Sequence, residues 1–461
     1  MDVKSIKKAG YYISDEITEK QPFPSGVCGC RDFRIPGLIR LADGSLFATS
    51  DARWTDADSD YGGIDTVFAI SRDGGEHWSH GYAALFPDTL GTPDDPSDST
   101  TCIDPDPVQT PDGVIHIFVN MLPTGVAFDL HRPVTGNGFI SVNGRKYLAL
   151  TDEISAADDP RAFGYYAWEY EGGFARIFNL SGEYTGFAID GYFNIYAERE
   201  GEFCELYQPQ IGSGEQVVQN VFYRDSSFHV LNTMFTLDLY SDDLAKTWRW
   251  RTVSGEIKSQ DEDYIISSPG NAVVTRSGRA VLPFYYYSEE RANSFLVMSD
   301  DCFVSFYRSP YLETDAKAPS RGESKAVELP DGNIRLFYRN SAKRICYADY
   351  ILEKGEWREA VVLPVLVHSD CNFAAVSRGR NVYIIYARGR GGEAMNRANG
   401  RVYAFLLGEN CEMILEDIYP VNNDAFSYAV GCFTDKNELA VLYDTCELGK
   451  VIFKTIDVTS P

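Results

Sequence analysis

The sequence predicts an all-β protein, and three observations support this fold class. Runs rich in β-branched and aromatic residues recur through most of the chain, and each run follows a polar turn that usually contains glycine. Tyrosine (29) and phenylalanine (27) are plentiful, and both favour strands. No segment keeps the 3.6-residue apolar period of a long helix, so strands remain as the regular structure.

The clearest predicted strands are 45–49, 114–119, 279–284, 333–338 and 382–386. The contents of hydrophobic residues (44%) and charged residues (24%) are those of an ordinary globular protein. A chain of 461 residues can form two or three domains, or one large all-β domain with an insertion, and length alone does not decide between these.

The net charge of −25 argues against a nucleic-acid partner, because such binding depends on Lys and Arg displacing counterions. It also argues against an anionic membrane surface, and no apolar run is long enough to span a membrane. An acidic protein that binds an anionic ligand needs a local cluster of positive charge. The arginines that lie within apolar strands are therefore the residues to consider first.

The ten cysteines are scattered apart from Cys28 and Cys30, which favours reduced thiols over a disulfide framework. Residues 1–8 are not followed by an apolar run, so the secretory pattern is missing. We expect a cytoplasmic protein, or a secreted or cell-surface one if a leader has been removed. We take a monomer as the expected oligomeric state.

The sequence favours chemistry without a cofactor or a metal. The six histidines form no His-Glu-x-x-His pattern, and there is no Gly-x-Ser-x-Gly elbow or glycine-rich nucleotide loop. Asp56, Asp58 and Asp60 have the spacing of a calcium loop, but Tyr61 stands at its sixth position and Val67 at its twelfth, where glycine and glutamate are needed.

Two motifs narrow the fold class. Residues 33–36 read Phe-Arg-Ile-Pro and place an arginine on the first strand of a hairpin, where it needs an anionic partner. In the segment Ser71–Trp78, the Ser and Asp side chains can close a tight turn through the backbone, glycine at position 75 permits the turn, and the tryptophan can pack between strands.

Together these motifs resemble the FRIP motif and the Asp-box of bacterial exo-sialidases (neuraminidases), the family 33-like glycoside hydrolases. The resemblance implies a six-bladed β-propeller. It also implies retaining hydrolysis of terminal α-ketosidically linked sialic acid through a tyrosyl-enzyme intermediate, with sialylated glycans or free sialosides as substrates.

The spacing of Asp-box segments predicts an insertion in the propeller. A second box spans Ser241–Trp248 and a degraded third box spans Ser299–Phe306, 58 residues further on, which is a plausible length for one blade. The first two boxes lie 170 residues apart. We therefore expect a propeller formed by 1–124 and 229–461, with a small β-rich domain inserted at 125–228. Two further blades with eroded boxes are the alternative.

The chemistry of sialosides defines what the site requires. The anomeric carbon C2 carries a carboxylate, which would repel a carboxylate nucleophile, and sialidases use a tyrosine instead. A phenol has a pKa near 10 and needs a neighbouring base. The family resemblance implies this tyrosine with its base, an acid for the leaving oxygen, and three arginines for the substrate carboxylate.

The catalytic positions of the family pattern fall on three residues. Asp60, in a Ser-Asp pair, matches the general acid that later acts as general base. Glu323 matches the residue that polarises the nucleophile, and Tyr428 matches the nucleophile itself. Any one of these residues alone would more often be a structural residue, and it is their order along the chain that carries the assignment.

The substrate-binding positions follow the same order. Arg34, Arg339 and Arg397 match the three carboxylate-binding arginines, and Arg53 matches an arginine that contacts a ring hydroxyl. Asp104 is expected either to line the pocket near the ring substituents or to be a turn aspartate before proline. Nearby competitors for the role of Arg397 are Arg388, Arg390 and Arg401.

One departure from the family bears on the product. The resemblance implies that sialidases releasing a 2,7-anhydro sugar carry a tryptophan beyond the nucleophile strand, and residues 443–449 contain none. Hydrolysis is therefore favoured over intramolecular transfer. Two more functions stay open on the sequence: hydrolysis of a related ulosonic acid, either deaminated sialic acid or a Kdo-type sugar, and glycan binding by a non-catalytic propeller.

Overall fold

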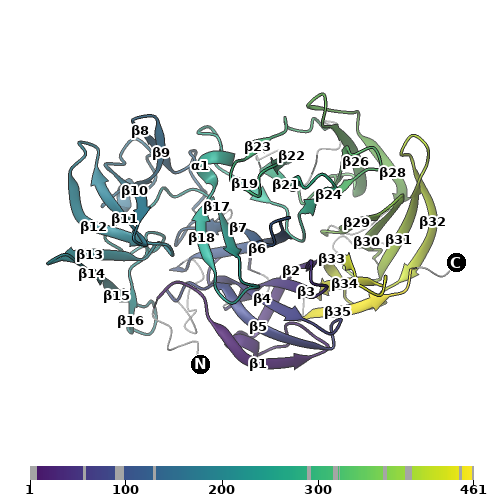
Figure 1. Ribbon diagram of the computed structural model, residues 1–461, viewed down its shortest axis with the longest axis horizontal. Coiled ribbons are helices and arrows are strands. Elements are labelled where there is room, and N and C mark those ends of the chain that lie inside the picture. Colours follow the sequence, from purple (N-terminus) through teal and green to yellow (C-terminus); the bar gives the residue numbers. More distant parts are fainter. Residues whose placement is uncertain are drawn as a thin grey trace.

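The computed structural model describes residues 8–54, 59–88, 98–127, 131–287, 292–314, 320, 322–366, 371–389, 397–445 and 449–458. These residues form a propeller-like body of β-sheets with a further sheet at one side (Figure 1). Helical structure in the described ranges is limited to α1 (Ser254–Ile257) and short 3-10 turns such as Val27–Gly29 and Ile154–Ala156. The predicted all-β fold is confirmed.

The first part of the body is a nine-stranded sheet made of two antiparallel units. One unit contains β1 (Ile13–Glu19), β2 (Asp32–Arg40), β3 (Leu46–Arg53), β4 (Ile64–Ser71) and β5 (His77–Ala84). The other contains β6 (Thr101–Gln109), β7 (Ile115–Leu122), β17 (Phe235–Ser241) and β18 (Arg249–Thr252). A single parallel pair, Ile64 with Thr101, joins the two units.

Four further sheets complete the body. The first contains β19 (Ile265–Ser267), β20 (Val273–Val274), β21 (Ala280–Tyr287), β22 (Ala292–Ser299) and β23 (Tyr307–Arg308). The second contains β24 (Lys325–Glu328), β25 (Ile334–Arg339), β26 (Arg344–Ile351), β27 (Glu356–Trp357) and β28 (Val361–Leu366). The third contains β29 (Ala374–Arg378), β30 (Asn381–Ala387), β31 (Gly400–Leu407) and β32 (Met413–Pro420). The fourth contains β33 (Ser427–Phe433), β34 (Leu439–Asp444) and β35 (Val451–Ile456).

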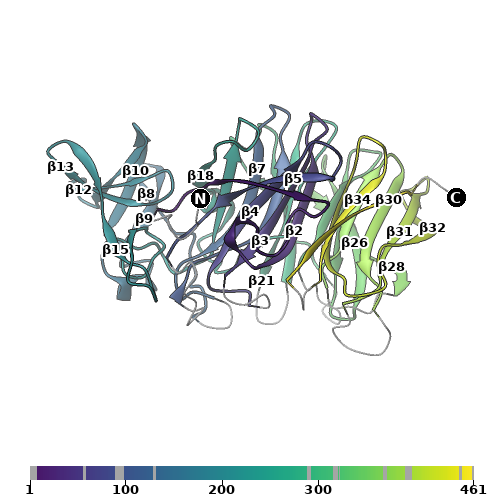
Figure 2. The ribbon, with the colours of Figure 1, turned by 90° about the horizontal axis from the view of Figure 1, so that it is seen from below.

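One strand of each of these units contacts the equivalent strands of its neighbours, and these inner strands surround a common centre. Strand β2 contacts β6 and β33, β6 contacts β20, β20 contacts β24, β24 contacts β29, and β29 contacts β33, so the contacts close on themselves. Figure 2 shows the strands side by side, with their connections at two opposite faces of the body. Residues far apart in sequence are thereby brought together at the centre.

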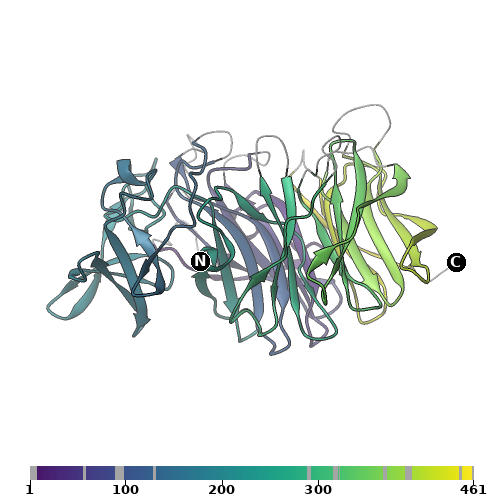
Figure 3. The same cartoon turned by 90° about the horizontal axis from the view of Figure 1, so that it is seen from above.

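A separate sheet lies beside the body, between β7 and β17 in the chain (Figure 3). Its seven strands are β8 (Phe139–Val142), β9 (Arg145–Leu150), β10 (Tyr165–Glu171), β11 (Phe174–Asn179), β12 (Tyr184–Asp190), β13 (Ile195–Arg199) and β14 (Glu202–Glu205). The pair β15 (Tyr207–Pro209) and β16 (Gln216–Val218) follows it. The limits 125–228 and the count of six blades remain predictions.

The Asp-boxes form the turns that their side chains predict. In the first box the Ser71 hydroxyl donates to Asp73 and accepts the N–H of Gly75, and Asp73 accepts the N–H of His77. Trp78 is fully buried. In the degraded third box, Ser299 and Asp301 make the same bonds, with Phe303 in the left-handed conformation (φ 65°) at the glycine position. The turn therefore depends on the Ser and Asp side chains more than on glycine.

The nine cysteines of the described ranges are free thiols. A search of the described residues finds no helix that is long and apolar enough to cross a membrane.

Candidate active site

The predicted site residues lie at irregularities of the inner strands. One extra residue interrupts the pairing of β2 after Arg34, of β6 around Asp104 and of β33 at Tyr428. Non-glycine residues adopt left-handed backbone at these points: Ile35 (φ 54°), Asp104 (φ 64°) and Tyr428 (φ 43°), joined by Glu323 (φ 49°) just before β24. Such bulges redirect side chains and gather at functional sites. Here they turn side chains of neighbouring strands toward one place.

Tyr428, Glu323 and Arg339 form a hydrogen-bonded chain. The Tyr428 hydroxyl donates to Glu323 Oε1 at 2.7 Å, and the Arg339 guanidinium donates to Oε2 of the same carboxylate at 2.5 Å. The Glu323 side chain is buried, so its charge is compensated by Arg339 and its position is fixed. This geometry allows Glu323 to take the phenolic proton.

Two further arginines flank the same tyrosine. The guanidinium carbons of Arg34 and Arg397 each lie 5.5 Å from the centroid of the Tyr428 ring. Arg34 Nε also donates to Asp444 Oδ2 at 3.3 Å, and the backbone N–H of Ile35 donates to the same oxygen. The structure thus brings the three predicted arginines together around Tyr428 and Glu323.

The alternatives to Arg397 as the third carboxylate-binding arginine have other contacts where the structure describes them. Arg401 donates to the carbonyl oxygens of Gly400 and Asn422 and to the Asn423 side chain, so its guanidinium is held at the end of its own strand. The charge of Arg388 acts on Tyr403. Arg390 lies outside the described residues. Arg397 is the arginine of this group that contacts the Tyr428 ring.

Arg53 and Asp60 form a second charged group. The Arg53 side chain is fully buried, and it donates to Asp51 at 2.9 Å and to the Ser59 carbonyl oxygen. The Asp60 carboxylate lies 3.1 Å from Arg53, while its side chain is 73% exposed. Asp60 is therefore held on one side and open to solvent on the other, as a proton donor for an incoming ligand must be. Asp56 and Asp58 lie outside the described residues.

Asp104 lies within β6, so it is not a turn aspartate, which was one of the two roles expected for it. Its backbone N–H donates to Asp51 Oδ1 at 3.1 Å, and its carboxylate accepts from Asn120. Burial, followed by the charges of Asp51 and Glu323, raises the pKa of Asp104 well above its usual range. A raised pKa extends the pH range over which this carboxyl is protonated and can donate a hydrogen bond.

The electrostatics of the nucleophile position oppose ionisation in the free site. Burial raises the pKa of Tyr428 well above 10, and the Glu323 charge acts in the same direction, while Arg339 and Arg397 act against them. The phenol is thus neutral at rest, and it can lose its proton only as a base accepts it.

Sequence reasoning missed the residues that hold these groups. Asp444 binds Arg34, Asp51 binds Arg53, and the Cys371 thiol accepts the backbone N–H of Tyr428 at 3.3 Å. Tyr285 is also close, because the charges of Glu323 and Asp104 act on its hydroxyl. Asp444 had a sequence signal, because it is an acidic residue at the end of a strand. Asp51, Cys371 and Tyr285 had none, because their contacts depend on the register of the strands.

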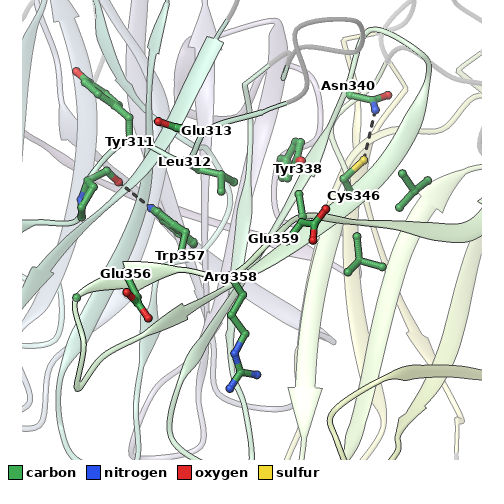
Figure 4. Close-up of a pocket in the computed structure, with 15 residues that line it drawn as sticks. Tyr311, Leu312, Glu313, Tyr338, Asn340, Cys346, Glu356, Trp357, Arg358 and Glu359 are labelled. Atoms are coloured by element: carbon green, nitrogen blue, oxygen red, sulfur yellow. Dashed lines mark hydrogen bonds between the residues drawn. The ribbon is translucent and has the colours of Figure 1, made fainter.

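A cavity of about 730 Å³ lies elsewhere, between the sheet of β22 and the sheet of β26 (Figure 4). Tyr338 and Asn340, the neighbours of Arg339, line it together with Tyr311 and Trp357. None of the predicted catalytic residues is among its lining residues. The described residues also contain no cluster of His, Cys, Asp and Glu that could hold a metal.

Comparison of the sequence with family models gave no match. Characterised proteins related to the chain include an anhydrosialidase and a sialidase. The anhydrosialidase of Macrobdella decora is 25% identical over 457 residues, which cover 89% of this chain and 58% of that protein. Sialidase B of Streptococcus pneumoniae serotype 4 is 25% identical over 333 residues, covering 67% of this chain and 45% of that protein. The chain thus spans about half the length of these relatives.

Solved structures share the fold. The intramolecular trans-sialidase of Ruminococcus gnavus superposes with a TM-score of 0.79 at 23% identity, covering 94% of this chain and 96% of that one. The leech intramolecular trans-sialidase superposes with a TM-score of 0.78 at 24% identity, and the match covers 96% of this chain and 70% of that one.

The chain has the fold of these sialidase structures, and it gathers a tyrosine, a glutamate and three arginines at one place. The sequence relatives are sialidases, and the chain is a homologue of the bacterial sialidase family, as its motifs predicted.

Proposed function

We propose that the chain is an exo-α-sialidase that hydrolyses terminal α-ketosidically linked sialic acid with retention of configuration. The observation that carries this proposal is the 2.7 Å hydrogen bond from Tyr428 to Glu323, with Arg34 and Arg397 beside the ring. It combines an activated phenol with positive charge for the substrate carboxylate.

In the proposed reaction, Arg34, Arg339 and Arg397 bind the carboxylate at C2. Glu323 accepts the phenolic proton as Tyr428 Oη bonds to C2, and the bond to the leaving oxygen breaks as Asp60 protonates it. Asp60 then takes a proton from water, the water oxygen bonds to C2, and the tyrosyl oxygen leaves and recovers its proton from Glu323. Two displacements at C2 give net retention.

The fold that supports this site is proposed to be a six-bladed propeller with an inserted β-rich domain. The closed cycle of contacts among the inner strands supports six blades, and these strands are β2, β6, β20, β24, β29 and β33. The nine-stranded sheet contributes two of these blades, since one residue pair alone joins its halves. The separate sheet Phe139–Glu205 supports an insertion within 125–228.

Hydrolysis is proposed over intramolecular transfer because the hydrogen bonds and ring contacts of the six tryptophans are made with residues other than Tyr428. Trp54 donates to the buried Asp65 and stacks on Tyr82, and Trp78 and Trp248 belong to Asp-boxes. The others are Trp168 in the separate sheet, Trp250, which donates to the Ala83 carbonyl, and Trp357, which donates to the Pro310 carbonyl.

Intramolecular transfer is the second candidate, favoured by the names of the related leech anhydrosialidase and of the trans-sialidase structures. A fluorogenic α-ketoside of N-acetylneuraminic acid, with mass spectrometry of the released sugar, separates the two. Free sialic acid supports hydrolysis, and a 2,7-anhydro sugar supports transfer. A folded protein that releases neither would contradict both, and deaminated and Kdo-type ulosonic acids would be tested next.

A further inference from the structure

A cavity of about 370 Å³ opens where the separate sheet meets the body, away from the Tyr428 site. Strands β9 and β10 pair from Leu150–Tyr165 as far as Leu148–Ala167, and beyond that pair their facing residues are not paired. The pairing of β10 with β11 is also irregular between Ala167 and Tyr170. The pairing of β9 with β10 ends at this point, and residues of both strands line the cavity together with Arg251 and Thr252 of β18.

Aromatic rings from both strands line this cavity. Tyr147 of β9 and Trp168 of β10 are stacked, with ring centroids 4.7 Å apart and planes inclined by 16°. Trp168 is nevertheless 37% exposed. The Tyr147 hydroxyl is buried and lacks a well-formed hydrogen bond among the described residues, with the Arg145 guanidinium as its charged neighbour.

The polar groups of the cavity carry little uncompensated charge. Arg145 and Glu169 form an ion pair at the mouth, where both side chains are largely exposed. Lys146 Nζ donates to the Gly255 carbonyl oxygen at 2.6 Å and its charge interacts with that of Glu256, and Arg251 is paired with Asp238 at 2.8 Å. The floor is apolar, with Phe139, Leu148 and Phe193. These features suit a neutral ligand that has an apolar face and several hydroxyls.

We propose that this cavity binds a neutral hexose unit of a glycan chain. The apolar C–H face of the sugar packs on Trp168, and its hydroxyls bond to the exposed side chains of Arg145 and Glu169. The volume lies within the usual range for small-molecule sites, about 300–1,000 Å³. The inference goes beyond the proposed catalysis and holds whether or not the Tyr428 site cleaves sialosides. A second glycan site on the same chain would raise affinity for polyvalent glycans through effective concentration.

The test uses the full chain carrying Tyr428→Phe, with methyl β-D-galactopyranoside and lactose as probes in ligand-observed NMR titrations. Neither probe contains a carboxylate for the arginine cluster. We expect saturable binding in the millimolar range, weakened at least about tenfold by Trp168→Ala. Tyr184→Ala is the matched control, because Tyr184 lies in the same sheet, is also 37% exposed and does not line the cavity.

A second variant, Glu169→Gln, keeps the side-chain shape and is expected to weaken binding as well, and circular dichroism checks the fold of each variant. Equal binding in the Trp168→Ala, Glu169→Gln and Tyr184→Ala proteins, or no saturable binding of either sugar, would overturn the proposal. Trp168→Ala is expected to leave cleavage of a small fluorogenic sialoside unchanged, so the result does not depend on the catalytic proposal.

Discussion

The Tyr428 hydroxyl donates to the Glu323 carboxylate at 2.7 Å, although 105 residues separate the two in the chain. Both residues adopt left-handed backbone, Tyr428 at a bulge of β33 and Glu323 just before β24. Backbone strain of this kind persists only where the surrounding structure holds it. For Tyr428, the Cys371 thiol that accepts its N–H is part of that support.

Replacing Glu323 with glutamine should lower kcat by about 10²–10⁴-fold, because the amide can still accept the Tyr428 hydrogen bond but cannot take its proton. Steady-state kinetics on a fluorogenic sialoside measures the effect. Glu328→Gln is the control, since Glu328 lies five residues further on and pairs with the exposed Arg276. Comparable losses in the two variants would show that Glu323 has no special role.

Arg397→Ala should reduce kcat/KM by about 10- to 100-fold, the value of one hydrogen bond to a charged group. The Arg401→Ala protein should keep a kcat/KM close to that of the parent protein, because the Arg401 side chain contacts Gly400, Asn422 and Asn423. A larger loss in Arg401→Ala than in Arg397→Ala would move the third carboxylate-binding role to Arg401.

Asp60→Ala should impair natural sialosides far more than aryl sialosides, since a phenolate leaving group needs little protonation whereas a sugar alcohol needs it fully. The ratio of kcat/KM values for 3′-sialyllactose and an aryl sialoside reports this. Equal losses on both substrates would argue that Asp60 acts by position or charge and not as an acid.

The first Asp-box should give a pH-dependent contribution to stability. Hydrogen bonds from the backbone N–H and the side chain of His77 lower the pKa of Asp73 from 3.8 to about 2. The ionised Asp73 therefore stabilises the fold fully above pH 3.8, and this stabilisation is lost as the pH falls through about 2. The same hydrogen bond raises the pKa of His77, whose contribution is present below 6.5 and lost as pH rises. The stability difference between the parent protein and Asp73→Asn, measured by denaturant unfolding, should therefore be greatest between about pH 4 and 6.5. A difference that does not change with pH would contradict this.

Much of the site could be predicted because its residues occur in motifs with local signals. Arg34 follows Phe33 in an apolar strand, and Glu323, Arg339 and Tyr428 follow in the order that the family resemblance implies. The partners could not be predicted in this way. Whether Asp444 reaches Arg34 depends on the register of β33 and β34 and on the contact of those strands with β2.

The fold, like the site, could be predicted from the sequence only in part. The all-β class follows from composition and turn signals, and the third Asp-box was recognisable from Ser299 and Asp301 even without its glycine and tryptophan. The place of Asp104 was not predictable, because a bulge within β6 arises from pairing with β7 and leaves no local mark beyond the following proline. The cavity lined by β9 and β10 likewise lies where the pairing of these strands ends, which no local signal in the sequence marks.

The central claim is that Tyr428 forms the covalent intermediate, and trapping that intermediate tests it most directly. With a 3-fluorosialosyl fluoride, fluoride leaves as the tyrosyl oxygen bonds to C2, and the fluorine at C3 slows the second step by destabilising the oxocarbenium-like transition state. Peptide mass spectrometry should find one added fluorosialosyl group on the peptide that contains Tyr428, and none in Tyr428→Phe, which should also lose at least about 10³-fold in kcat. Tyr443→Phe, a buried tyrosine of the adjacent strand, should label normally. A label on another residue, or full activity in Tyr428→Phe, would contradict the account.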